Sequence, residues 1–280
     1  MQFFKYEALG NDYIVLDPRA VPAVPSEAVI RRICDRNRGL GSDGILYGPV
    51  VQEGRFSVRI FNPDGSEAGK SGNGLRIFAR YLYEHGYAKP EVIEMATVAG
   101  PAKAEVLDAD EGVIRIDMGD YSFWSSDIPV AGPPREVVDE SIFVRGESFR
   151  VTCVGIGNPH CVLFPQEVSS AEVQRVGPWL TDFELFPEKI NVQLVRPVNP
   201  ARIAIEIFER GAGYTLASGS SSCAAAAAAH RRGLVGPSLT VMMPGGELRV
   251  ELGPGQRASL TGQALPVAEG EIASSLVRSE

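Results

Sequence analysis

The stretch from residue 61 to residue 78, FNPDGSEAGKSGNGLRIF, sets the pattern for the whole chain. It follows a β-branched alternating run, is crowded with glycine and serine, and opens a run with helical spacing. The stretch from residue 208 to residue 225, FERGAGYTLASGSSSCAA, has the same three features. Ser71 and Ser218 occupy matching points in the two stretches, 147 residues apart. We interpret this as an internal duplication, in which each half supplies a strand, a glycine-rich loop and a helix N-terminus.

The same separation recurs elsewhere in the chain. It relates short turn motifs, aromatic residues and the strands expected after the two helices, which supports a duplication of the whole unit rather than of one loop. The further matched pairs are Gly10 with Gly157, Asn11 with Asn158, Phe61 with Phe208, and residues 92–96 with residues 239–243.

The chemistry of such a loop suggests an anion site. The first turn of a helix carries backbone N–H groups without intrahelical partners and a partial positive charge, and glycines let a ligand approach closely. Two helix starts around one carboxylate, with one side chain on each face, could move a proton from one face of a carbon to the other. In the alternative interpretation, Ser71 and Ser218 are ordinary N-caps, for which serine is a preferred residue.

Composition excludes several classes of protein. The chain has 280 residues, of which 44% are hydrophobic and 22% are charged, as in a soluble globular protein large enough for two domains. Its net charge of −8 argues against a nucleic-acid-binding or membrane-binding surface. We find no apolar run long enough to span a membrane and no N-terminal signal-peptide pattern, so we expect a cytoplasmic protein. The four cysteines show no CxxC spacing, so buried free thiols without a metal site are expected.

Periodicity predicts short strands around a few helices. The alanine run at residues 224–229 is a strong helix former, which we interpret as a central helix wrapped by strands. The expected helices are at residues 26–37, 75–84 and 171–180, besides the alanine run. The expected strands are at residues 3–6, 13–17, 45–47, 55–61, 91–96, 102–107, 112–118, 149–154, 161–164, 191–195, 201–208, 239–243 and within 264–277, with a crossover at 121–134.

Several motifs in this order are specific to one family. They are ALGNDYIVLD, GLGSDGIL, FNPDGSEAGKSGNGLRIFAR, GNPHCV, INVQ and ERGAGYTLASGSSSCAAA, and between about residues 3 and 253 the chain resembles the diaminopimelate epimerase family. The resemblance implies an α+β fold of two pseudo-symmetric domains, each a strand-wrapped, barrel-like central helix, with the active site in the cleft between them. We expect one domain at residues 1–120 with a C-terminal strand at about 264–278, and the other at residues 121–263. The resemblance also implies a homodimer.

The resemblance implies an activity as well. Members of this family invert the α-carbon of an amino acid without a cofactor, using one cysteine as thiolate base and another as thiol acid on the opposite face. Ser71 and Ser218 stand at the two cysteine positions here. A serine hydroxyl is a far weaker acid than a thiol and normally needs an adjacent base. His160 is the candidate orienting or activating residue, and a hydrogen-bonded structural histidine is the alternative.

The family's substrate-holding positions are largely kept. The resemblance implies that backbone N–H groups at the two helix starts bind the reacting carboxylate, that a glutamate holds the α-ammonium, and that an arginine with amide side chains binds the distal end of diaminopimelate. Each residue also has a structural alternative as a turn former or surface ion pair, and Tyr214 replaces a glutamate common in the family motif. The residues concerned are Gly72, Asn73, Gly219 and Ser220 at the helix starts, Glu209 at the ammonium, Arg210, Asn62 and Asn191 at the distal end, and Asn11 and Asn158 beside them.

Three hypotheses follow for the function. The first is an epimerase that interconverts LL- and meso-diaminopimelate in lysine and peptidoglycan-precursor biosynthesis. The second is a racemase, isomerase or dehydratase of the same superfamily that acts on another amino acid. The third is a non-catalytic amino-acid-binding homologue, because both thiols are absent. Ligand binding without α-proton exchange would separate the third from the two enzymes.

Overall fold

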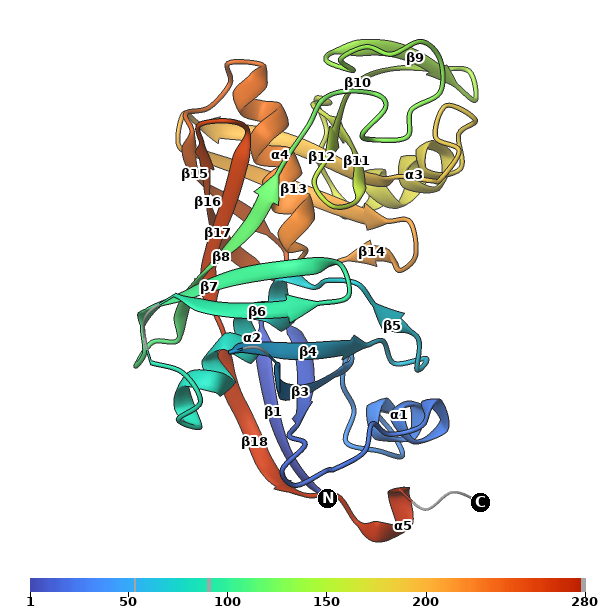
Figure 1. The fold of residues 1–280 in the computed structure, drawn as a ribbon. Coiled ribbons are helices and arrows are strands. Elements are labelled where there is room, and N and C mark those ends of the chain that lie inside the picture. The colour runs from blue at the N-terminus through green and yellow to red at the C-terminus, as the bar shows by residue number, and fades with distance from the viewer. Residues whose placement is uncertain (53, 90–91, 278–280) are drawn as a thin grey trace. The chain divides into compact units, whose positions relative to one another are not determined.

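The computed structural model describes residues 1–52, 54–89 and 92–277 (Figure 1). The chain divides into two compact units, an N-terminal unit of Met1–Asp117 with Thr261–Glu280, and a C-terminal unit of Met118–Leu260. Each unit combines a set of paired strands with a few helices, so the predicted α+β class is confirmed. None of the helices in these described ranges is both long and apolar enough to cross a membrane.

The sheet of the N-terminal unit curls around one helix. Its strands pair in the order β18, β1, β2, β3, β4, β6, β7, β8, and β5 forms a hairpin with β4. The β2–β3 and β4–β6 pairs are parallel and the other pairs are antiparallel. The bounds are β1 Gln2–Ala8, β2 Asn11–Leu16, β3 Ile45–Gln52, β4 Arg55–Phe61, β5 Glu67–Ala68, β6 Ile93–Thr97, β7 Gly100–Asp108, β8 Val113–Asp120 and β18 Leu265–Glu271.

Helix α2, Gly72–Glu84, is the central element of this unit. It packs against β1, β2, β3 and β7, and every residue from Asn73 to Leu82 is buried. Leu75, Phe78 and Leu82 form an apolar stripe at helical spacing, and the opposite side of the helix, with Arg76 and Arg80, is buried as well. The helix begins after the N-cap Ser71 and ends near Gly86, whose φ of 70° suits the turn that follows. Two further helices, α1 Glu27–Cys34 and α5 Ser274–Val277, pack against each other.

The C-terminal unit repeats this plan. Its strands pair in the order β9, β10, β11, β12, β13, β15, β16, with β14 as a hairpin on β13, and the β11–β12 and β13–β15 pairs are parallel. The bounds are β9 Glu140–Val144, β10 Glu147–Gly155, β11 Pro159–Leu163, β12 Asn191–Asn199, β13 Arg202–Glu209, β14 Gly213–Thr215, β15 Ser238–Met243, β16 Gly246–Gly253 and β17 Arg257–Gln263. The helices are α3 Ser170–Thr181 and α4 Gly219–Arg231.

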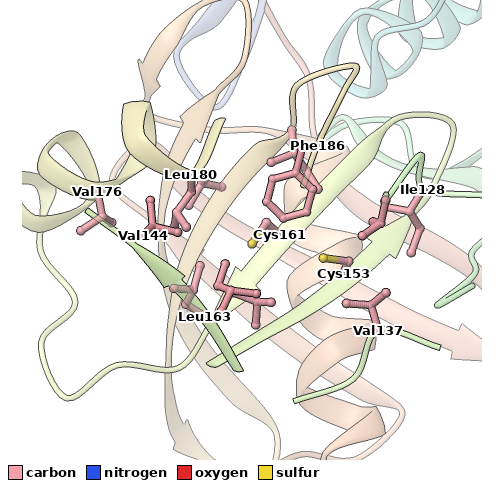
Figure 2. Packing of buried hydrophobic residues seen from close by; sticks show 14 of the residues in the cluster. Ile128, Val137, Val144, Cys153, Cys161, Leu163, Val176, Leu180 and Phe186 are labelled. Carbon is pink, nitrogen blue, oxygen red and sulfur yellow. The ribbon is translucent and has the colours of Figure 1, made fainter. Parts of the chain in front are cut away.

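Helix α4 is the central element of the C-terminal unit. All six alanines at residues 224–229 are buried, and the helix packs against β10, β11, β12, β13, β15 and β16. A second apolar cluster lies between β9–β12 and α3, and Figure 2 shows Cys153, Cys161 and Phe186 within it. Cys153 and Cys161 are directly opposite each other in the β10–β11 register. All four cysteines are buried as thiols rather than paired in disulfides, as expected for their spacing.

The duplication is visible in the strand registers. Helices α2 and α4 begin 147 residues apart and end 147 residues apart. The pair Ile45↔Phe61 of β3–β4 has its counterpart in Val192↔Phe208 of β12–β13, at the same separation. The predicted match of residues 92–96 with 239–243 is wrong by one residue, because Phe56 pairs with Met95 whereas Ile203 pairs with Val241.

Several predicted elements need correction. The expected C-terminal strand at 264–278 ends at Glu271. Its partner β1 begins at Gln2, which pairs with Glu271, so the strand has no partner beyond that residue. The chain then forms α5, and residue 278 lies outside the described residues. Residue 91, the expected start of β6, also lies outside them. Strands β9, β16 and β17 are not among the strands expected from the sequence. Strand β9 has only five residues and lies between Asp139 and Arg145, which both have positive φ, so its sequence pattern is short.

Candidate active site

Ser71 begins the half-site of the N-terminal unit. As the N-cap of α2, it has extended backbone geometry, and its Oγ accepts a hydrogen bond from the N–H of Gly74 at 3.0 Å. The Tyr13 hydroxyl lies 3.2 Å from the same Oγ. Tyr13 belongs to β2 and is only 7% exposed, whereas Ser71 is half-buried. The Ser71 hydroxyl therefore has both a backbone donor and a phenol as neighbours.

Two amide side chains fix the loop beside Ser71. The Nδ2 of Asn73 donates to the Oδ1 of Asn11 at 3.2 Å, and the Oδ1 of Asn73 accepts from the buried Arg76 at 2.7 Å. The Nδ2 of Asn11 in turn donates to Asp43 at 2.9 Å. These contacts link the β1–β2 turn to the start of α2, next to the N–H groups of the first helical residues, which begin at Gly72.

Asn62 has a local structural role. Its Nδ2 donates to the hydroxyl of Ser66 at 2.9 Å, and its backbone N–H donates to the Ser66 carbonyl at 2.8 Å. The side chain thus closes the turn between β4 and β5, as asparagines commonly do. The structure places Asn62 in the loop that leads to Ser71.

Ser218 begins the half-site of the C-terminal unit, and its surroundings differ from those of Ser71. It is the N-cap of α4 and its Oγ accepts the N–H of Ser221 at 3.5 Å, a long contact. The carboxylate of Glu209 lies near the hydroxyls of Ser218 and Thr215, and the Thr215 hydroxyl donates to the carbonyl of Gly213 at 3.2 Å. Burial raises the pKa of Glu209, and the neighbouring hydroxyls of Ser218 and Thr215 partly offset that rise. The Ser218 hydroxyl therefore has as a neighbour a carboxylate that is more basic than an exposed one.

His160 does not hold the Ser218 hydroxyl. The imidazole is fully buried, its Nε2 lies 2.8 Å from the Oδ1 of Asn158, and its Nδ1 lies 3.1 Å from the Nε2 of Gln193. Because an amide oxygen can only accept, Nε2 carries the proton and Nδ1 accepts from Gln193. Burial lowers the pKa of His160 to about 3, so the ring is neutral. The imidazole orients Asn158, whose Nδ2 reaches the hydroxyl of Ser220 at 3.5 Å.

Arg210 directly follows β13, and Asn191 is the first residue of β12. The Oδ1 of Asn191 accepts the backbone N–H of Arg210 at 3.0 Å, and its Nδ2 donates to the carbonyl of Pro159 at 3.0 Å. Both polar atoms of the Asn191 side chain are therefore hydrogen-bonded within the protein. The Arg210 side chain is exposed, with Nη1 donating to the carbonyl of Glu188 at 2.9 Å, so other guanidinium N–H groups can bind a ligand.

The two half-sites share a backbone arrangement but differ in several side chains. The contact between Asn11 and Asn73 recurs between Asn158 and Ser220, at the same separation of 147 residues. By contrast, Tyr13 corresponds to His160, and Asn62 corresponds to Glu209. Sequence reasoning missed Tyr13, although its match with His160 under the repeat could have revealed it. Within the described parts of the chain, no three histidine, cysteine, aspartate or glutamate side chains gather as a metal site would require.

A family model described as diaminopimelate epimerase matches residues 3–124 and 152–265. The chain belongs to the diaminopimelate epimerase family. A diaminopimelate epimerase 2 from Nostoc sp. strain PCC 7120 is 45% identical over 277 residues, covering 99% of this chain and 97% of the relative. A diaminopimelate epimerase from Moorella thermoacetica is 39% identical, covering 97% of this chain and 99% of the relative. Membership places the chain among isomerases that act on a small molecule.

Solved structures support the fold. A probable proline racemase from Agrobacterium radiobacter K84 aligns with a TM-score of 0.70 at 17% identity, over 98% of this chain and 93% of the other. A hydroxyproline epimerase from Agrobacterium vitis aligns with a TM-score of 0.69 at 17% identity, over 98% and 92%. The strand-wrapped helix of the diaminopimelate epimerase family is therefore shared with distant racemases and epimerases.

Proposed function

We propose that the protein is a cofactor-independent epimerase that interconverts LL- and meso-diaminopimelate by moving the α-proton between the two faces of one carbon. The observation that carries the proposal is a pair of serine-capped helix starts, matched by the duplication, in a member of the diaminopimelate epimerase family. The reaction serves lysine and peptidoglycan-precursor biosynthesis, and its expected location is the cytoplasm.

The reacting carboxylate is proposed to bind at the helix starts. Each serine takes the N–H of the third helical residue, and the N–H groups of the first two residues remain to donate to an anion. These are the groups of Gly72 and Asn73 in one half-site, and of Gly219 and Ser220 in the other. Arg210 is proposed to bind the distal carboxylate, because its guanidinium is exposed and a guanidinium forms paired hydrogen bonds with a carboxylate.

The amide side chains are proposed to hold the ends of this site. Asn11 and Asn158 keep the turns beside the two helix starts in place through their contacts with Asn73 and Ser220. Asn191 positions the backbone of Arg210, and Asn62 shapes the loop before Ser71. These asparagines therefore act partly by positioning the neighbouring backbone and side chains that contact the substrate.

Proton removal is assigned to Ser218 with Glu209. The α C–H bond breaks as its proton passes to the Ser218 Oγ, and the hydroxyl proton of Ser218 passes to the Glu209 carboxylate. The electron pair left on the α-carbon spreads into the substrate carboxylate, and the Ser71 hydroxyl delivers a proton to the opposite face. Return of one proton from Glu209 to the Ser71 half-site through solvent restores both groups. Burial supports this assignment because it raises the pKa of Glu209 and so strengthens it as a proton acceptor.

Glu209 can also hold the substrate ammonium, as the family resemblance implies. An ionised carboxylate has two oxygens and about four acceptor positions, which is enough for the Ser218 hydroxyl and the N–H groups of one ammonium. The same residue therefore orients the substrate and takes the proton. The serines in place of thiols favour a second candidate, a homologue that binds the amino acid without turning it over.

Proton NMR in deuterated water tests the proposal. LL-diaminopimelate is incubated with the protein, and loss of the α-proton signal and growth of the meso isomer are followed together. Exchange with epimerisation is the expected result. Binding without exchange would identify the non-catalytic homologue, and absence of binding would exclude diaminopimelate and direct the search to other amino acids.

A further inference from the structure

We infer that Tyr13 is a positioning residue that donates its phenol hydrogen to the Ser71 hydroxyl and thereby makes Ser71 the proton-donating group of the pair. The inference rests on the proposed function, because it assigns a direction to one of its two hydroxyls. It begins from a contact that the family motifs did not reveal, the 3.2 Å separation of the Tyr13 hydroxyl and the Ser71 Oγ.

The position of the Tyr13 ring is fixed by its surroundings. Tyr13 lies in β2, which packs against α2, and pairs with Tyr6 across the β1–β2 ladder. The ring also covers Gly44, where an added Cβ would come within 2.7 Å of the ring atom Cε1. A glycine there leaves just enough room for the ring, so the hydroxyl stays near the start of α2.

Hydrogen-bond capacity decides the role of Ser71. A serine hydroxyl has one donor hydrogen and two acceptor lone pairs. One lone pair of Ser71 takes the N–H of Gly74, and the phenol, as the stronger acid of the two hydroxyls, fills the other. The hydrogen of Ser71 is then left for a ligand, so Ser71 gives a proton in the direction in which Ser218 takes one, and the reverse reaction runs through the same steps backwards.

Ser218 has the opposite arrangement. Its hydroxyl lies near the Glu209 carboxylate, and we assign its hydrogen to that carboxylate because an ionised carboxylate can only accept. The N–H of Ser221 is 3.5 Å from the Ser218 Oγ, so a lone pair remains weakly held and can take a proton. The two serines are matched in position, but one is arranged to deliver a proton and the other to receive one.

The proton count balances across the step. When the Ser71 O–H bond breaks and the C–H bond forms, the Tyr13 O–H bond breaks and its proton restores the Ser71 hydroxyl. Tyr13 is left as a phenolate and Glu209 as a carboxylic acid. Transfer of one proton from Glu209 to Tyr13 through solvent returns both groups to their starting forms, with no change in oxidation state.

The first test does not depend on activity. Ser71→Cys introduces a thiol at the start of α2, while the four native cysteines are buried, and its titration is followed by the pH dependence of alkylation. A phenol that donates to a thiolate stabilises it, so adding Tyr13→Phe should raise the thiol pKa by about one to two units. Tyr6→Phe is the matched control, because Tyr6 is the cross-strand partner of Tyr13 but donates to Glu84. An equal pKa with and without Tyr13→Phe would overturn the inference.

The second test uses the reaction itself in deuterated water. In the chain with Ser71, Tyr13→Phe should slow inversion while α-proton exchange at the Ser218 face continues, so the ratio of exchange to inversion should rise about tenfold. A purely structural role would lower both rates equally, which would also overturn the inference. If the unaltered protein epimerises and Tyr13→Phe changes nothing, the proposed function stands and the inference falls. If the unaltered protein is inactive but the thiol pKa responds, the Tyr13 contact is supported and the proposed function falls.

Discussion

The half-site around Ser71 and the half-site around Ser218 have the same backbone and different chemistry. Both begin a 13-residue helix with a serine N-cap, and both carry an asparagine contact at matching positions. They differ in the group beside the serine, which is the phenol of Tyr13 in one and the carboxylate of Glu209 in the other. Helix starts bind a carboxylate in the same way wherever they occur, but removal and delivery of a proton need different partners.

The contrast between the two half-sites predicts its largest effect, on the epimerisation rate, for Glu209→Gln. The amide keeps the shape and can still accept a hydrogen bond from Ser218, but it cannot take the proton. We expect the epimerisation rate to fall by about 10³-fold, within the usual range for a lost general base. The rate is measured by conversion of LL- to meso-diaminopimelate. Glu206→Gln, on the same strand, is the control and should leave the rate almost unchanged; a similar loss in both variants would remove Glu209 from its assigned role.

A smaller effect is expected at the distal end of the substrate. Arg210→Ala should weaken binding of LL-diaminopimelate by about tenfold, because one exposed guanidinium–carboxylate contact is lost. Calorimetric titration measures this directly. Arg202→Ala is the matched control, since Arg202 lies on β13 and pairs with Glu247. Unchanged affinity in Arg210→Ala would mean that the distal carboxylate binds elsewhere or that the substrate lacks one.

The smallest effect concerns stability and sharpens the contrast between Tyr13 and His160. The folded chain keeps His160 neutral down to about pH 3, whereas an unperturbed histidine titrates near 6.5. Unfolding therefore takes up a proton between these values. The stability of the fold is unaffected by protonation of His160 above about pH 6.5 and decreases as the pH falls below it. Between pH 7 and pH 5, the free energy of unfolding should fall by about 2 kcal/mol more in the unaltered protein than in His160→Gln.

Urea unfolding of both proteins at the two pH values measures this difference. Because the N-terminal unit has Tyr13 at the position that matches His160, the effect should be confined to the C-terminal unit, and hydrogen exchange can locate it. Equal pH dependence in the two proteins would show that His160 is not held neutral by burial.

The frame of the fold could be predicted from the sequence because it depends on local patterns. Ser71 and Ser218 mark helix starts through their glycine-rich surroundings, and the separation of 147 residues carries over to helices and to registers such as Ile45↔Phe61. Strand β9 could not be found in this way, because a five-residue strand between two turns has too short a pattern. Strand β18 is shorter than the sequence predicts, because its end is set by the start of its partner β1 and not by its own residues.

The site was predictable only in outline. The helix starts and Glu209 followed from the family motifs, but the partner of each serine depends on how side chains of different elements meet. Tyr13 reads as an ordinary strand residue until the structure places its hydroxyl beside Ser71. His160, the candidate activator in the sequence, is instead enclosed between Asn158 and Gln193. Such contacts depend on burial and orientation, which a single sequence does not contain.

The most direct test of the central claim compares Ser71→Ala with Ser218→Ala in deuterated water, starting from each diaminopimelate isomer in turn. For the isomer whose α-proton faces Ser218, we predict that Ser71→Ala still exchanges the α-proton but no longer inverts the carbon, and that Ser218→Ala does neither. Loss of exchange and inversion together in both variants with this isomer would contradict the account, because the two serines would then act as one unit rather than as an acceptor and a donor of the proton.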